Sequence, residues 1–165
     1  MKKSFIISAI ALLISFNSHA QSGIGIGGGI SIPVFEASDV SSFGFRLDAN
    51  FLAEVSSGIY LGGATGFANM FGKEEKFPLV TIDHDDFQYI PVAVAARYKL
   101  SSEIEIGGDM GYAIAVSDNW DGGFYYRPIF GYNVSDNFQV NMSFTGVSDS
   151  WITWSTFDIG ILFRP

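Results

Sequence analysis

The sequence of 165 residues contains no cysteine. Its residues therefore cannot form a disulfide bond, a thiol nucleophile, a cysteine-ligated metal site or a lipid-modified N-terminal cysteine. Basic residues are also scarce: nine Lys and Arg stand against 17 Asp and Glu, which gives a formal net charge of −8. Because nucleic-acid phosphates repel such a surface, we expect no nucleic-acid partner.

The apolar run near the N-terminus lies within residues 1–20, which have the layout of a secretory signal peptide. Lys2 and Lys3 form its basic start, an apolar stretch covers 5–14, and 18–20 read Ser-His-Ala, a small-x-small cleavage site. A membrane-anchoring helix is the alternative, but this run is well short of the roughly 20 residues that span a bilayer. We therefore predict a cleaved signal peptide and export.

The remaining residues, 21–165, amount to one domain. Without the two N-terminal lysines, seven basic residues face 17 acidic ones, so the mature chain carries a formal charge of −10. Gly and aromatic residues are abundant, and almost no window resembles an amphipathic helix. An apolar–polar alternation with a period of two instead predicts eight strands. We place them at 22–35, 43–55, 58–70, 87–100, 102–116, 123–134, 137–147 and 151–164.

The connections between these strands alternate in length. Tight turns follow the second, fourth and sixth strands, around 56–57, Ser101 and 135–136. The other connections are longer or richer in turn residues, and they cover 36–42, 71–86, 117–122 and 148–150. Outer-membrane barrels have short periplasmic turns and longer outside loops. The pattern therefore predicts an all-β fold, an eight-stranded antiparallel up-and-down transmembrane β-barrel with both termini on the periplasmic side.

Each predicted strand has an apolar face and a polar face, as where Val92 and Val94 alternate with Ala93 and Ala95. A soluble secreted barrel that binds a small apolar ligand in its core would show the same alternation with the apolar face inward. Two features favour the membrane orientation. The polar face mixes small residues with a few long charged ones, which suits a narrow eight-stranded lumen. The apolar face is rich in aromatic residues near the strand ends.

These aromatic residues predict two rings at the membrane interfaces. The periplasmic ring would contain Tyr98, Tyr132, Phe138 and Phe163, and the outer ring Phe67, Phe124, Tyr126, Phe144 and Trp151. We expect Trp120 and Trp154 to be interface anchors as well.

The inward faces carry charges of both signs, and these residues form the predicted structural charge network of the lumen. Its members are Arg46, Asp48, Glu54, Arg97, Lys99, Glu103, Glu105, Asp109, Arg127, Asp158 and Arg164. Charges in a narrow, low-dielectric lumen persist when they are paired and hydrogen-bonded. We therefore expect ion pairs that fill the barrel. A charge-lined pore is the alternative, but porins need about sixteen strands for an open channel.

The segment 83–86, Asp-His-Asp-Asp, is the most chemically suggestive cluster of the chain. His84 between carboxylates would suit an outer-membrane lipid-modifying enzyme or protease, or weak divalent-cation binding. It is the only histidine left after export, and no serine-hydrolase arrangement accompanies it. The loop 117–122 has oxygen ligands near a glycine but lacks the spacing of a calcium-binding EF-hand loop. We therefore predict no catalytic residue, metal site or cofactor.

Several features of the sequence resemble a known family of membrane proteins. The signal peptide, the eight amphipathic strands, the segment 89–92 (Tyr-Ile-Pro-Val) and the final 157–163 (Phe-Asp-Ile-Gly-Ile-Leu-Phe) resemble the small outer-membrane β-barrel superfamily, porin-like and of the OmpA/OmpX type. The resemblance implies insertion by the barrel-assembly machinery, which recognises a terminal aromatic residue, and no cofactor. In this chain Phe163 is followed by two further residues. Such barrels serve many tasks, so the resemblance implies no single activity.

Together these observations predict a non-enzymatic protein of the outer membrane with a side-chain-filled lumen and four outer-surface loops. Its role would be structural or would consist of surface interactions. The expected partners are outer-membrane lipid, the barrel-assembly machinery during insertion and an unidentified surface ligand. We expect the protein to be a monomer.

Overall fold

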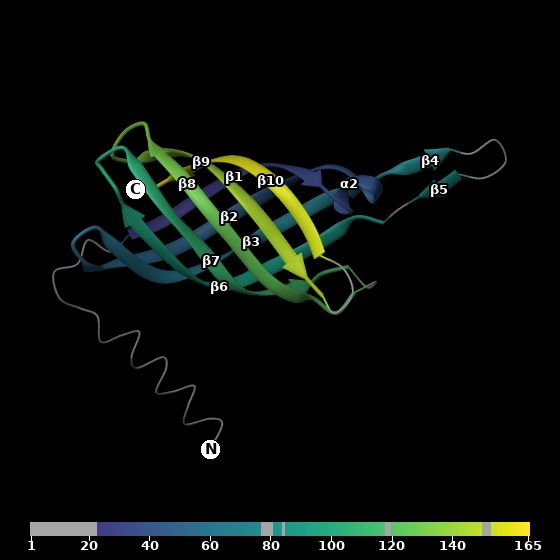
Figure 1. Ribbon diagram of the computed structural model, residues 1–165, viewed down its shortest axis with the longest axis horizontal. Helices are drawn as coiled ribbons and strands as arrows, with labels where there is room; N and C mark the ends of the chain where they lie inside the picture. Colours follow the sequence, from purple (N-terminus) through teal and green to yellow (C-terminus); the bar gives the residue numbers. More distant parts are fainter. Residues whose placement is uncertain (1–22, 77–80, 84, 118–119, 150–152) are drawn as a thin grey trace, which may run out of the picture.

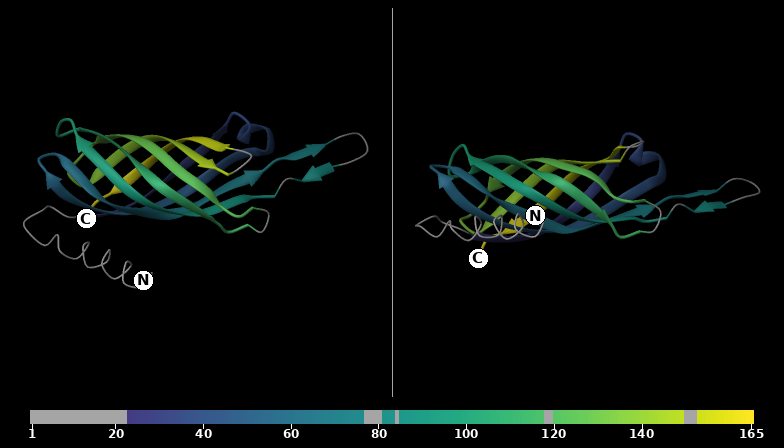
Figure 2. Two further views of the ribbon diagram at one scale, coloured as in Figure 1. Left: turned by 60° about the horizontal axis from the view of Figure 1, so that its bottom comes forward. Right: turned by 90° about the horizontal axis from the view of Figure 1, so that it is seen from below.

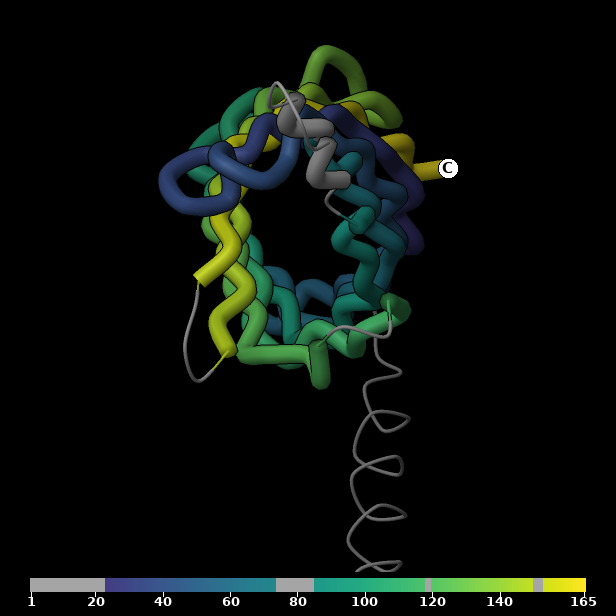
Figure 3. The backbone as a smooth tube through the Cα atoms, turned by 90° about the vertical axis from the view of Figure 1, so that its right-hand side faces the viewer, coloured from purple at the N-terminus to yellow at the C-terminus, as the bar shows by residue number. Residues whose placement is uncertain are grey.

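The computed structural model describes residues 23–76, 81–83, 85–117, 120–149 and 153–165. Their strands close into an antiparallel barrel in the order β1-β10-β9-β8-β7-β6-β3-β2, and Figure 3 shows the ring along its axis. The barrel strands are β1 (Gly23–Val34), β2 (Ser41–Ser56), β3 (Ile59–Gly72), β6 (Phe87–Lys99), β7 (Ile104–Ala115), β8 (Gly123–Asn133), β9 (Phe138–Ser148) and β10 (Thr153–Phe163). The predicted eight-stranded up-and-down fold is confirmed.

The two ends of the barrel differ (Figure 1). One end, called the turn end, carries the C-terminus and the short connections 57–58, 100–103 and 134–137. Gly58, with φ +75°, takes a left-handed conformation in the tightest of these turns. The opposite end, called the loop end, carries the longer connections, so the alternation read from the sequence is present in the fold.

The loop end holds three short elements that the alternation did not predict. These are the helix α2 (Ala37–Val40) and the paired strands β4 (Glu74–Lys76) and β5 (Thr81–Asp83). The hairpin β4–β5 projects well past the barrel (Figures 1 and 2). The sequence analysis assigned 71–86 to a long connection and predicted no strand within it, so the pairing of these segments is an addition. No helix in the described part of the chain is both long enough and apolar enough to cross a membrane.

The strands turn their apolar faces outward. On β6, Val94 is 72% exposed, whereas the neighbouring Ala95 is 1% exposed. The same alternation follows the other strands, with Leu47, Met110 and Ile161 among the exposed apolar residues. A soluble barrel that holds an apolar ligand needs the reverse arrangement, so the structure does not support that alternative.

Aromatic rings gather on the outer surface near both ends. At the turn end, the rings of Phe138 and Phe163 lie 5.0 Å apart. At the loop end, Tyr126 lies between Phe124 and Phe144, at 6.2 and 6.4 Å between ring centroids. The predicted rings therefore have described members at both ends. Trp151 and the predicted signal peptide, 1–20, lie outside the described residues, and the signal peptide stays a prediction.

Close packing between a strand backbone and a lumen side chain explains why position 107 is a glycine. A Cβ atom added to Gly107 would lie 2.6 Å from Cδ of Arg97 and would collide with the carbonyl oxygen of Ala96. Gly63 faces outward, and a Cβ atom there would meet nothing closer than 3.8 Å. The two glycines form a matched pair for testing how tightly the lumen is packed.

We expect Gly107→Ala to lower the free energy of unfolding by about 1–3 kcal/mol, because overpacking displaces backbone or side chains. Gly63→Ala should change it by less than about 0.5 kcal/mol. Urea unfolding of the refolded barrel, followed by tryptophan emission, measures both. Equal stability of the two variants would show that the lumen is loosely packed at Arg97.

Candidate functional site: the filled lumen and its two mouths

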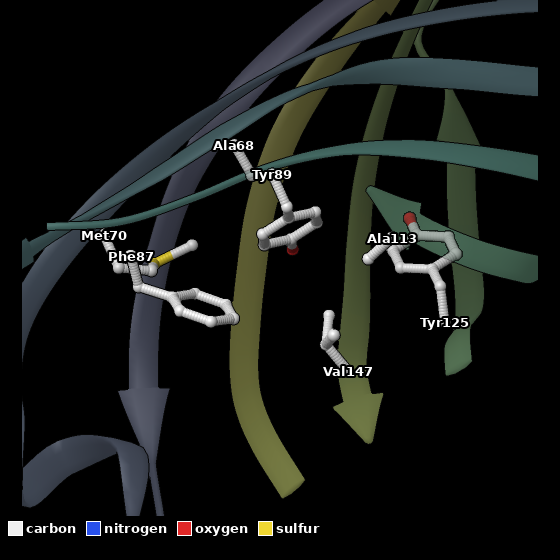
Figure 4. Packing of buried hydrophobic residues seen from close by; sticks show 7 residues of the cluster. All are labelled: Ala68, Met70, Phe87, Tyr89, Ala113, Tyr125 and Val147. Carbon is white, nitrogen blue, oxygen red and sulfur yellow. The ribbon is translucent and has the colours of Figure 1, made fainter. Parts of the chain in front are cut away.

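The side chains that point toward the barrel axis form three layers. The layer nearest the loop end is an apolar cluster contributed by β3, β6, β7, β8 and β9 (Figure 4). Its members are Ala68, Met70, Phe87, Tyr89, Ala113, Tyr125 and Val147. Tyr89 and Tyr125 lean toward one another across this layer, with 6.3 Å between ring centroids. The cluster closes the lumen with rings and methyl groups.

Two tryptophans extend this cluster into the loop-end mouth. The ring of Phe87 stacks on Trp154 at 4.3 Å and 6° and on Trp120 at 4.6 Å and 29°. The expectation that Trp120 and Trp154 are interface anchors is therefore wrong. Trp154 shares its sheet face with Thr156 and Asp158, which are buried in the lumen. The period of two on β10 thus already indicated an inward indole.

The middle layer is a continuous chain of opposite charges. Asp48 pairs with Arg46 and, at 2.7 Å between Oδ1 and Nη1, with Arg127. Asp109 lies 3.9 Å from Arg127 and 2.7 Å from Arg97. The contact between Asp109 Oδ1 and Arg97 Nη2 is an ion pair without the alignment of a hydrogen bond. These five side chains are at most 11% exposed, so little water screens their attraction.

The pair Arg127–Asp48 connects opposite walls of the barrel. Arg127 stands on β8 and Asp48 on β2, and four steps around the ring separate these strands in either direction. Arg46 also reaches across, because its Nη2 donates to Oδ1 of Asn141 on β9 at 2.8 Å. The charge chain therefore lies across the axis as well as along the wall. The space left beside it is about 20 Å³, room for one or two waters.

Asp158 belongs to a separate arrangement of hydroxyl groups. Its carboxylate is 0% exposed and accepts hydrogen bonds from Thr145 at 2.6 Å, Thr156 at 3.0 Å and Ser143 at 3.2 Å. Among the described residues it has no ion-pair partner. Hydrogen bonds stabilise a buried carboxylate in place of a counter-charge. Ser143 also accepts from Nε of Arg127, so the two arrangements meet.

The third layer, at the turn end, lines a vestibule of about 550 Å³. Arg164 donates to Glu105 at 2.7 Å, and Gln139 donates to the same carboxylate at 3.1 Å. Lys99, another lining residue, lies 4.6 Å from the ring centroid of Tyr60. The structure thus places Glu105 and Arg164 apart from the central chain.

Two further members of the predicted network form hydrogen bonds within turns. Glu54 accepts a hydrogen bond from the backbone N–H of Gly58 at 2.9 Å. The exposed Glu103 accepts from the hydroxyl of Ser101 at 3.2 Å. The predicted network contained only charged groups, so it left out the uncharged partners Asn141, Gln139, Ser143, Thr145 and Thr156. All five lie on the inward face by the same period of two, which is the signal that could have found them.

The two candidate catalytic or metal-binding segments of the sequence, 83–86 and 117–122, are only partly described. Within the described ranges, no group of three or more His, Asp or Glu side chains is arranged to hold a metal ion. His84, which carried the enzyme alternative, lies outside the described residues. Asp118 and Asn119 of the loop 117–122 lie outside them as well.

The barrel is similar to solved outer-membrane proteins. The crystal structure of Ail, the attachment invasion locus protein of Yersinia pestis, aligns with a TM-score of 0.57 and 17% identity over 90% of this chain and 100% of that one. Ail in a phospholipid bilayer nanodisc gives 0.56 and 15% over 88% and 100%. OprG of Pseudomonas aeruginosa gives 0.51 and 12% over 90% and 98%. This chain has the fold of the small outer-membrane barrels.

A designed transmembrane β-barrel has the same fold, with a TM-score of 0.57 and 14% identity over 87% of this chain and 95% of that one. No protein-family model matches the sequence, and no curated protein matches it. The resemblance inferred from the strand pattern is thus confirmed at the level of fold.

The central charge chain predicts a strong coupling between Arg97 and Asp109. Arg97→Met should lower the free energy of unfolding by about 3–5 kcal/mol, because it leaves a buried carboxylate short of a partner. Adding Asp109→Leu should recover part of that loss. Urea unfolding of both single variants and the double variant gives the coupling energy.

Lys99→Met is the matched control for removing a positive charge. Lys99 is half-buried beside the vestibule, so this variant should lose no more than about 1 kcal/mol. Additive effects of Arg97→Met and Asp109→Leu would contradict a structural ion pair.

Proposed function

We propose that the chain is a non-enzymatic outer-membrane protein whose filled barrel is a structural support for the loops at one end. The observation that carries the proposal is the inverted distribution of polarity. Apolar side chains such as Val94, Met110 and Ile161 cover the outside, while Asp109 and Arg127 are buried within. A continuous apolar exterior is stable against lipid and prone to aggregation in water.

The dimensions of the barrel support a membrane location. A transmembrane strand needs about 9–11 residues. β8, β9 and β10 each have 11. The aromatic rings near both strand ends suit the two lipid–water interfaces. These features agree with the signal peptide predicted from the sequence and with outer-membrane lipid as the surrounding partner.

The termini and loop lengths support one orientation. With the turn end in the periplasm, the predicted signal peptide precedes β1 on the side where exported chains arrive. The loop end, with α2 and the hairpin β4–β5, then faces outward. Phe163, 40% exposed at the end of β10, stands where the barrel-assembly machinery would meet a terminal aromatic residue. We propose insertion by that machinery and a monomeric barrel.

The lumen supports a structural role over catalysis or conduction. Its central carboxylates, Asp48 and Asp109, are each held by two arginines, and Asp158 is held by three hydroxyl groups. Groups bound in this way are poor general bases and leave little room for ions. Surface interaction at the loop end is therefore the favoured activity.

The proposal predicts that a charge placed on the outer belt disrupts the barrel only when it lies at the middle of the membrane. Val94→Arg, near the middle of β6, should cost about 2–4 kcal/mol of stability in a lipid bilayer. Unfolding in lipid vesicles measures the cost, and recovery in the outer-membrane fraction with heat-modifiable gel migration reports assembly.

Val134→Arg is the matched control. Val134 is 63% exposed in the turn between β8 and β9 and should lose no more than about 1 kcal/mol. Recovery of the unsubstituted protein as a soluble periplasmic species would overturn the proposal.

A further inference from the structure

The loop-end mouth contains a pocket of about 240 Å³ with two kinds of wall. One wall is aromatic and consists of Trp120, Phe87 and Trp154. The other carries carboxylates and consists of Asp85, Asp86 and Asp149. The three carboxylates are exposed while Phe87 is buried, so the pocket descends from a wet acidic rim to an apolar floor.

The aromatic wall is held in place from below. Phe87 lies between the two indoles and is 7% exposed, and the buried Val147 completes the floor. Stacked rings supported by a barrel wall present a fixed apolar surface, so little ordering is lost when a ligand docks. The volume is below the range of about 300–1,000 Å³ for drug-sized ligands, so the ligand would be small.

The acidic wall defines the charge of the ligand. The described lining contains three carboxylates and no basic side chain. Asp86 is oriented by the backbone N–H of Gly72, which donates to Oδ1 at 3.1 Å. The chain as a whole carries a net charge of −8. This field attracts cations and repels anions before contact is made.

We propose that this pocket binds a small organic ammonium ion with an apolar body. The ammonium group lies among the carboxylates, and the apolar body lies against the rings. A cation beside aromatic rings is stabilised by both the carboxylates and the ring faces. A bare metal ion fits less well, because half of the wall offers no oxygen ligand.

The test uses the full barrel refolded in detergent, with phenylethanolamine as probe. Tryptophan emission follows the titration. Phenylethylene glycol is the neutral analogue, since a hydroxyl replaces the ammonium group, and mandelate is the anionic one. Phenylethanolamine should bind saturably and about fivefold to tenfold more tightly than the glycol, a ratio that exposed ion pairs supply. Mandelate should not bind. Equal binding of all three would overturn the proposal.

Variants assign the selectivity to the pocket. The double variant Asp85→Asn/Asp149→Asn should weaken phenylethanolamine binding about threefold to tenfold and leave the glycol unchanged. Asp39→Asn removes a charge from α2, at the same end but outside the pocket, and should have no effect. If Asp39→Asn weakened binding equally, the charge selectivity would come from the overall negative charge of the loop end. That result would overturn a specific site.

Calcium distinguishes the organic cation from a metal. At matched ionic strength, calcium chloride should displace the probe no better than sodium chloride, and selective displacement by calcium would contradict the assignment. Binding in detergent does not depend on the membrane, whereas access from outside the cell rests on the proposed function. A failed titration therefore rejects the pocket alone, and a soluble periplasmic protein rejects the membrane role alone.

Discussion

One ion pair crosses the barrel from wall to wall, and the arrangement of the other side chains follows from it. Arg127 and Asp48 are 79 residues apart in sequence and stand on opposite strands of the closed ring. An eight-stranded barrel is just narrow enough for such side chains to meet. Buried charges must be paired or hydrogen-bonded, so the arginines and carboxylates on neighbouring strands join the same chain. Successive side chains of a strand point to opposite faces, and the outward positions between these groups carry apolar side chains.

The lumen differs on the two sides of this ion pair, so the two ends of the barrel are chemically distinct. Toward the loop end, rings and methyl groups close the lumen and support the stack of Phe87 with Trp120 and Trp154. Toward the turn end, a wide polar vestibule is lined by groups such as Lys99 and Arg164. The rigid aromatic end carries the longer connections and the projecting hairpin (Figures 1 and 2). Under the proposed function, a barrel filled in this way supports the loop end and does not conduct solutes.

The alternation of apolar and polar residues was enough to predict the eight barrel strands, their order and the face that most of their side chains occupy. It did not predict which inward groups meet, because partners such as Asp48 and Arg127 depend on the stagger between strands as the sheet closes. It also did not separate Asp158, whose neighbours are hydroxyl groups, from the paired carboxylates. Trp154 shows a different limit, because two signals conflict at this position. The period of two on β10 predicts an inward side chain, whereas the preference of tryptophan for membrane interfaces predicts an outward one. The hairpin β4–β5 could not be found by strand periodicity, because each of its strands has only three residues.

The central claim is that the polarity of the barrel is inverted, with lipid against the apolar faces. The sequence has no cysteine, so single cysteines can be placed along β6 and spin-labelled without removing native ones. In lipid vesicles, collisions with dissolved oxygen report contact with the hydrocarbon. The account predicts high oxygen accessibility at Val92 and Val94 and low accessibility at Ala93 and Ala95. Uniform accessibility along the strand, or the opposite phase, would contradict it.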